Sequence, residues 1–277
     1  MPYSYVTVTT LKGTGGLNIS GTAFDTRLRQ ITEHVSQQID RTVNRIFHPR
    51  TLTLELDGDG STLLMVPDLV SVTSLKEDTN EDGTFETTWA SVDYLLKPNT
   101  ARPTADYGSP YTYLQVNPRS DGTQDEFLKG PKMYELIGTF GYSRVLGTSL
   151  PKTSGTWGGA GTTSLLASTV GIEPGMTILV DSEQIYVEST ATTTLTVQRA
   201  MNGSTAATHT GTTTIQYYLY PGQVEEAVFI QTSRVWKRRD SGFVNQVGYP
   251  DTGVMVTWRG GLDPDVKELL TPFRRLH

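Results

Sequence analysis

The stretch TAFDTRLRQITEHVSQQIDRTVNRIF, residues 22–47, decides the fold expected of this chain. Thr22 and Asp25 stand at the spacing of a capping box, and Pro49 lies just beyond the other end. The pattern predicts a helix of about 26 residues, roughly 39 Å long, that spans the molecule. Its apolar residues recur at steps of three or four and share one stripe: Phe24, Leu28, Ile31, Val35, Ile39, Val43 and Ile46.

The opposite face of this predicted helix is polar. Such a face is either solvated or turned toward another subunit, and the sequence leaves both interpretations open. Its residues are Arg27, Arg29, Glu33, Gln37, Gln38, Asp40, Arg41, Asn44 and Arg45.

Composition limits the class of protein. A chain of 277 residues can form one large domain or two ordinary ones without a disulfide or a metal to complete a small core. A hydrophobic content of 36%, with plentiful Gly and Thr, favours β-rich and loop-rich structure over a compact α/β enzyme core. The lack of cysteine excludes disulfides, thiolate nucleophiles and cysteine metal sites. The net charge of −6 argues against a general nucleic-acid binder.

The beginning of the chain shows no targeting pattern. MPYSYVTVTT lacks the basic and apolar regions of a signal peptide, and no apolar run approaches the roughly 18 residues of a membrane helix. We therefore expect a soluble protein that is not exported by an ordinary signal and has no membrane partner. Residues 1–21 predict an extended arm, with an edge strand as the alternative.

Strand patterns follow the long helix. Residues 51–57 and 61–66 flank the turn sequence GDG, which predicts a hairpin. Together with later runs they predict a small antiparallel sheet of about six strands. The later runs are 69–77, 85–96, 113–116 and 134–143.

The composition changes at residue 151. Between 151 and 220 the chain holds many threonines and few charged side chains, and its short β-type runs are divided by Gly, Asn and Thr turns. This pattern predicts a small sandwich or barrel-like β module, inserted between the sheet and the helical sequence that follows.

Helical sequence resumes at PGQVEEAVFIQTSRVWKRRD, residues 221–240. Early Glu and late basic residues match the helix dipole. Asp263 and Pro264 predict the start of a short helix that ends near Pro272. The expected fold class is α+β: a long-helix and short-helix core, a small antiparallel sheet and an inserted all-β module. The expected domains are a core of residues 1–150 with 221–277, and the module at 151–220.

Catalytic and metal motifs are weak. The four histidines form no HExxH pair, and the chain lacks a GxSxG elbow, a phosphate loop and a dinucleotide fingerprint. Asp78, Asn80, Asp82 and Gly83 copy the first half of an EF-hand loop, but Trp89 stands where the closing Glu should be. Turn geometry explains such residues equally well. We expect a protein that is not an enzyme, with no catalytic residues, no cofactor and no metal site.

Two basic clusters are candidates for a partner interface. Helix capping explains the charges of the first cluster but not its Trp, whereas Arg and Trp are enriched at interface anchors. Protein docking is the preferred interpretation, with phosphate contact and helix capping as alternatives. The first cluster is Arg234, Trp236, Lys237, Arg238 and Arg239, and the second is Phe273, Arg274, Arg275, Leu276 and His277.

Three segments resemble one family. The run QIDRTVNRIFHPRTLTLELDGDGSTLLMVPDLVSVTSLKED (38–78), TTWASVDYLLKPNTARP (87–103) and PGQVEEAVFIQTSRVWKRRDSG (221–242) resemble the head-tail connector, or adaptor, proteins of tailed bacteriophages. The Thr-rich module departs from the shorter members of that family. Its segments 173–189 and 196–210 look like a small β module of phage structural proteins.

The resemblance implies a non-enzymatic virion protein at the head-tail junction, assembled in the host cytoplasm. Such proteins form a homo-oligomeric ring, usually twelve-fold, under the portal protein. The ring would extend the channel through which double-stranded DNA passes, and would offer a platform to tail or neck completion proteins. Residues 273–277 would then contact the portal.

Two other classes stay open. A carbohydrate-binding or adhesion protein of a phage tail or cell surface would use Trp157, Tyr186, Tyr217 and Tyr218 as stacking platforms. A glycoside hydrolase would need two carboxylates about 5–9.5 Å apart, which could be distant in the sequence.

Overall fold

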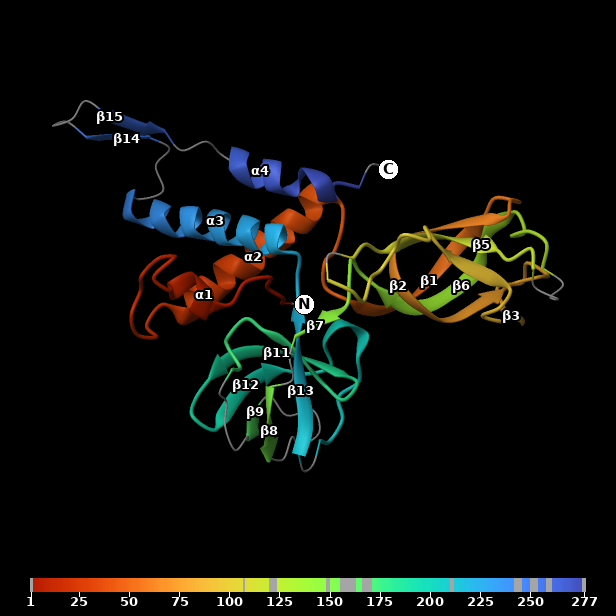
Figure 1. Cartoon of the computed structure of the whole chain (residues 1–277), viewed down its shortest axis with the longest axis horizontal. Helices are drawn as coiled ribbons and strands as arrows, with labels where there is room; N and C mark the ends of the chain where they lie inside the picture. Colours follow the sequence, from red (N-terminus) through yellow and green to blue (C-terminus); the bar gives the residue numbers. More distant parts are fainter. Residues whose placement is uncertain are drawn as a thin grey trace. The chain divides into compact units, whose positions relative to one another are not determined.

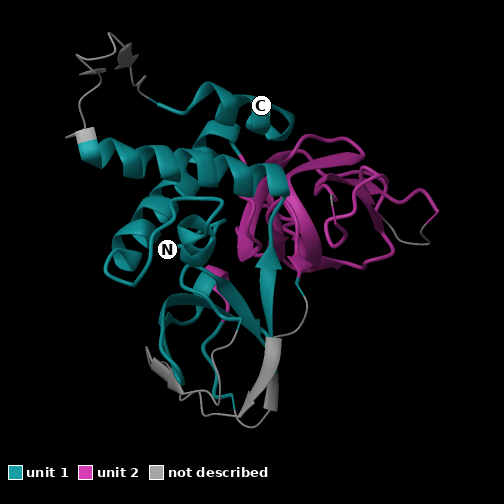
Figure 2. Cartoon of the chain, turned by 60° about the vertical axis from the view of Figure 1, so that its left-hand side comes forward, with its two compact units in different colours: residues 1–44, 147–201, 205–277 teal, residues 45–146, 202–204 magenta. Residues whose placement is uncertain are grey.

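The computed structural model describes residues 2–106, 108–119, 124–147, 150–154, 163–165, 171–209, 212–241, 246–249, 254–257 and 261–275. They form two compact units (Figure 2). Unit 1 holds residues 1–44, 147–201 and 205–277, and unit 2 holds residues 45–146 and 202–204.

The expected α+β fold class with a helical core is wrong. The described residues are mostly β, with two large antiparallel sheets, a small two-stranded one and only four α-helices (Figure 1). Two segments have strong helical periodicity, and this led to the prediction of a helical core although the sequence also contains many short strand patterns. A strand is recognised by few residues, so its share of the fold is easily underestimated.

The long helix is shorter than predicted. Helix α2 spans Asp25–Val43, 19 residues, which corresponds to roughly 28 Å. It ends because Asn44 adopts the left-handed conformation, with φ 55° and ψ 40°, and donates its N–H to the carbonyl of Asp40. At the other end Phe24 occupies the N-cap position, and Thr22 makes no capping box. The predicted apolar stripe is confirmed from Leu28 to Val43, whose residues are buried.

Three other helices complete the helical part of unit 1. The predicted extended arm contains helix α1 (Val8–Lys12), which Thr7 caps by accepting the N–H of Thr10. Helix α3 spans Gly222–Arg238 and packs against both α2 and α4 (Figure 1). Helix α4 spans Pro264–Leu270, and the side chain of Asp263 caps it as predicted.

A second antiparallel sheet has seven strands, of which β8 to β13 belong to unit 1 and β7 belongs to unit 2. The strand order is β7-β13-β10-β11-β12-β9, and β8 pairs with β13. Its apolar core includes Ile178, Ile185, Leu195 and Ile215. The strands are β7 (Val145–Leu146), β8 (Leu150–Ser154), β9 (Thr163–Leu165), β10 (Thr177–Val180), β11 (Glu183–Thr190), β12 (Thr194–Gln198) and β13 (Thr212–Leu219).

Unit 2 contains a six-stranded antiparallel sheet. The order is β1-β6-β2-β5-β4, with β3 on β2. Its core includes Trp89 and Phe127, whose rings stack at 4.7 Å between centroids. The strands are β1 (Arg50–Gly58), β2 (Leu63–Glu77), β3 (Thr87–Trp89), β4 (Tyr94–Lys97), β5 (Tyr111–Val116) and β6 (Gly130–Phe140).

The predicted hairpin of 51–57 with 61–66 is wrong. Strand β6 lies between β1 and β2 and pairs with both of them. Strand β2 runs through Pro67, which has no N–H to donate, and the register with β5 shifts between Met65 and Leu69 at that point. Strand β2 pairs with β5 over residues 63–69 and with β6 over residues 69–77, so it has a partner strand along its whole length.

The remaining elements of the described residues are two short strands and three short helical turns. Strands β14 (Gln246–Tyr249) and β15 (Val254–Thr257) form a two-stranded sheet. Short 3₁₀ turns lie at Met201–Gly203, Arg239–Ser241 and Thr271–Phe273. Among the described residues, none of the helices combines the length and the apolar character needed to cross a bilayer.

Candidate functional site

The first predicted interface cluster gathers at the end of α3. Trp236 is buried and meets the ring of Phe24 edge to face at 5.3 Å between centroids. The guanidinium of Arg239 lies over Trp236 at 4.1 Å and over Phe24 at 5.3 Å, at distances typical of cation–π contacts. Phe24 keeps 45% of its surface exposed, and Lys237 is also exposed. We call Phe24, Trp236, Lys237 and Arg239 the basic end.

Phe24 was predicted to lie in the core, but it is a surface residue. It belonged to the apolar stripe of the predicted helix, and that spacing favoured the core. In the structure it precedes the first turn of α2, where it covers Trp236. No local signal could have paired two residues so distant in the chain.

The remaining members of this cluster are more enclosed. Arg234 forms an ion pair with Asp263, the residue that caps α4, so it joins α3 to α4. Arg238 is half-buried. The exposed positive charge of the basic end therefore comes from Lys237 and Arg239, and Arg239 also forms an ion pair with the exposed Asp240 at 3.1 Å.

The second predicted cluster, the C-terminal segment, is fixed to unit 1 as far as Arg275. Phe273 is buried, and the backbone N–H of Arg275 donates to the carbonyl of Val43 at 2.9 Å. Arg274 is exposed between them. Leu276 and His277 lie outside the described residues.

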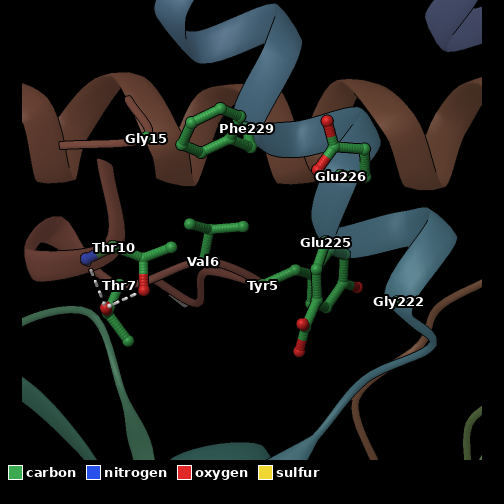
Figure 3. Close-up of a pocket in the computed structure, with 9 residues that line it drawn as sticks. All are labelled: Tyr5, Val6, Thr7, Thr10, Gly15, Gly222, Glu225, Glu226 and Phe229. Carbon is green, nitrogen blue, oxygen red and sulfur yellow. Dashed lines mark hydrogen bonds between the residues drawn. The ribbon is translucent and has the colours of Figure 1, made fainter. Parts of the chain in front are cut away.

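A groove of about 460 Å³ lies between the N-terminal arm and the start of α3 (Figure 3). Glu225 and Glu226 come from the first turns of α3, Phe229 follows one turn later, and Tyr5 and Thr10 belong to the opposite wall. Burial raises the pKa of the Glu225 carboxyl, against a smaller lowering by a hydrogen bond from the backbone of Tyr220. We call this site the acidic groove. The sequence had explained its two carboxylates by the helix dipole alone.

A network of charged side chains links β11 and the turn before it to the segment that follows β12. The ring nitrogens of His209 lie 2.6 Å from Asp181 Oδ2 and 2.9 Å from Glu183 Oε2. Arg199 makes hydrogen bonds of 2.6 Å to both carboxylate oxygens of Glu183 through Nε and Nη2. Burial by itself would raise the pKa of Glu183, but hydrogen bonds from Arg199, His209 and two backbone amides lower it to about 2. Glu183 and His209 are both buried, so neither offers a reactive group to solvent. The network therefore stabilises the fold of unit 1.

The EF-hand-like loop is a turn with three neighbouring carboxylates. Oxygens of Asp78, Asp82 and Glu86 lie within 4.8 Å of one another, a donor set that would suit a hard cation. Asp78 already accepts the N–H groups of Asp82 at 3.3 Å and Gly83 at 2.8 Å. These bonds fit the turn interpretation of the sequence. Glu86 was not part of the sequence motif.

Two of the aromatic residues considered for sugar stacking are placed unfavourably. Tyr186 is fully buried and donates its hydroxyl to Glu33 at 2.7 Å. Tyr218 is buried and Tyr217 is half-buried. Trp157 lies outside the described residues. Tyr186 and Tyr218 therefore present no ring face to a glycan.

The chain matches no protein-family model, and no curated protein is similar enough to count as related.

Proposed function

We propose that this protein is a structural adaptor of a tailed bacteriophage, which forms a ring on the portal, extends the DNA channel and carries the tail attachment platform. The resemblance of residues 38–78, 87–103 and 221–242 to head-tail connectors supports the proposal. The observation that carries it is the basic end, where the exposed Arg239 lies over the half-exposed ring of Phe24 and the buried ring of Trp236.

The residue types of the basic end fit a protein interface. Arg and Trp are the residues most enriched among interface anchors, and a half-exposed Phe beside them adds apolar area that binding would remove from water. The helix dipole explains why Lys and Arg stand at the C-terminal end of α3. It does not explain why Phe24, an apolar residue, lies exposed beside them. The net charge of −6 suits a conduit, because an acidic protein holds passing phosphates weakly.

The test is to mix the protein with purified portal rings from the same source and image the mixture by electron microscopy. We expect a second ring on one end of the portal. A chain truncated after Thr271 should lose this binding, but it also loses the buried Phe273 and could unfold. Arg274→Glu is therefore the sharper variant, since Arg274 is exposed.

Lys132→Glu is the matched control, because it reverses an exposed charge in unit 2. The control should bind like the unmodified chain, and Arg274→Glu should bind at least tenfold less. Absence of any added ring with the unmodified chain would overturn the adaptor proposal. If Arg274→Glu binds the portal as well as the unmodified chain does, the C-terminal segment is not part of the contact with the portal.

A further inference from the structure

The acidic groove and the basic end lie at opposite ends of α3 and carry opposite charge. Glu226 and Lys237 are both exposed. They are separated by about three helical turns, so they share one face of α3 at a spacing of roughly 16 Å along its axis. One face of a single helix therefore offers an anionic and a cationic site.

The two surfaces are also complementary in their apolar groups. The groove combines two carboxylates with Phe229, and the basic end combines two cations with Phe24. A groove of about 460 Å³ has room for a long cationic side chain. Glu225 is half-buried there, so a cation brought beside it would stabilise its charged form.

We propose that the acidic groove of one copy binds the basic end of the next copy, with Lys237 and Arg239 pairing with Glu226 and Glu225. The inference rests on the proposed function and names the contact that joins copies in the ring. A contact between two different surfaces is heterologous and can close into a ring, whereas a contact of one surface with itself gives a dimer. Each exposed ion pair is weak, so the ring forms when many contacts are made together.

The absence of native cysteine allows a direct test by disulfide cross-linking. A Glu226→Cys, Lys237→Cys double variant is oxidised at high concentration, with and without portal rings. A head-to-tail contact joins position 226 of one copy to position 237 of the next, so we expect a ladder of covalent multimers on non-reducing gels. Each single variant should give no ladder. A product that stops at the dimer would overturn the ring contact in favour of an antiparallel pair.

Charge exchange gives a second readout on the portal. Glu226→Lys alone and Lys237→Glu alone each place like charges in the contact, and each should reduce ring formation at least tenfold. An equal mixture of the two variants restores opposite charges at every contact of an alternating ring, so it should form rings again. Lys129→Glu, an exposed reversal in unit 2, is the control and should leave ring formation unchanged.

The outcomes separate the two proposals. A ladder without portal binding supports the contact and overturns the adaptor function. Rings on the portal without a ladder, or without any effect of the charge reversals, support the adaptor function and overturn the contact.

Discussion

At the scale of single residues, Glu183 is a buried acid held by several hydrogen-bond donors. It is fully buried and accepts hydrogen bonds from Arg199, from His209 and from the backbone N–H groups of Ala200 and Ala207. A buried carboxylate is tolerated only with such partners, because desolvation of its charge is costly. A substitution that removes the charge of Glu183 but keeps the shape of its side chain should therefore measure how much the network stabilises unit 1.

We predict that Glu183→Gln lowers the free energy of unfolding by about 3 kcal/mol at pH 7, the magnitude typical of a broken buried ion pair. Urea unfolding followed by circular dichroism measures it. Glu188→Gln on the same strand is the control, because Glu188 is half-buried and bonds only Gln198 among the described partners. Glu188→Gln should lower the free energy of unfolding by less than about 1 kcal/mol. An equal loss of unfolding free energy in the two variants would contradict the stabilising role of the Glu183 network.

The pH dependence of stability follows from the same residue. The pKa of Glu183 is lowered from 4.5 in the unfolded chain to about 2 in the folded one. Its contribution is therefore fully present above pH 4.5 and is lost as the pH falls toward 2. Melting temperatures between pH 6 and pH 2.5 should fall more steeply for the unmodified chain than for Glu183→Gln. Parallel profiles would show that other carboxylates dominate acid unfolding.

At the scale of elements, the N-terminal arm is held on α2 by hydroxyl groups. Tyr5 donates to both carboxylate oxygens of Asp40 at 2.8 Å, and Tyr3 donates to one of them at 2.5 Å. Tyr5 also meets the ring of Tyr220 at 4.6 Å. Because the arm forms one wall of the acidic groove, these bonds also shape the groove.

We predict that Tyr5→Phe destabilises the docked arm by about 2 kcal/mol, since it removes a buried hydrogen bond to a charged group. Hydrogen exchange of residues 3–12 should become about thirtyfold faster. Tyr3→Phe, at a half-buried position, is the matched control with a smaller effect. Unchanged exchange in Tyr5→Phe would mean that packing alone holds the arm.

At the scale of the whole molecule, unit 2 is almost one continuous segment. Its core is built from residues of 45–146, and the backbone N–H of Tyr142 donates to the carbonyl of Ile46 at 2.8 Å, so the two ends of the segment lie together. A segment of domain size with its own core and adjacent ends has what independent folding requires.

We predict that a fragment of residues 45–146 folds alone. Its proton NMR spectrum should be dispersed and its thermal unfolding cooperative. The buried contacts of Glu77 with Trp89 and Tyr134 should persist, so Trp fluorescence should remain blue-shifted until the transition. An unstructured fragment would show that unit 2 depends on the rest of the chain.

The sequence by itself determined the elements whose signals are local. The apolar stripe of α2, the Asp263 and Pro264 start of α4 and most strands are confirmed, because helix periodicity, capping and alternation are properties of neighbouring residues. Only the tertiary structure decided the placement of β6 between β1 and β2, the cover of Phe24 on Trp236 and the bonds around Glu183. These depend on which distant segments meet, and that choice follows from burying apolar area and pairing backbone groups across the whole chain.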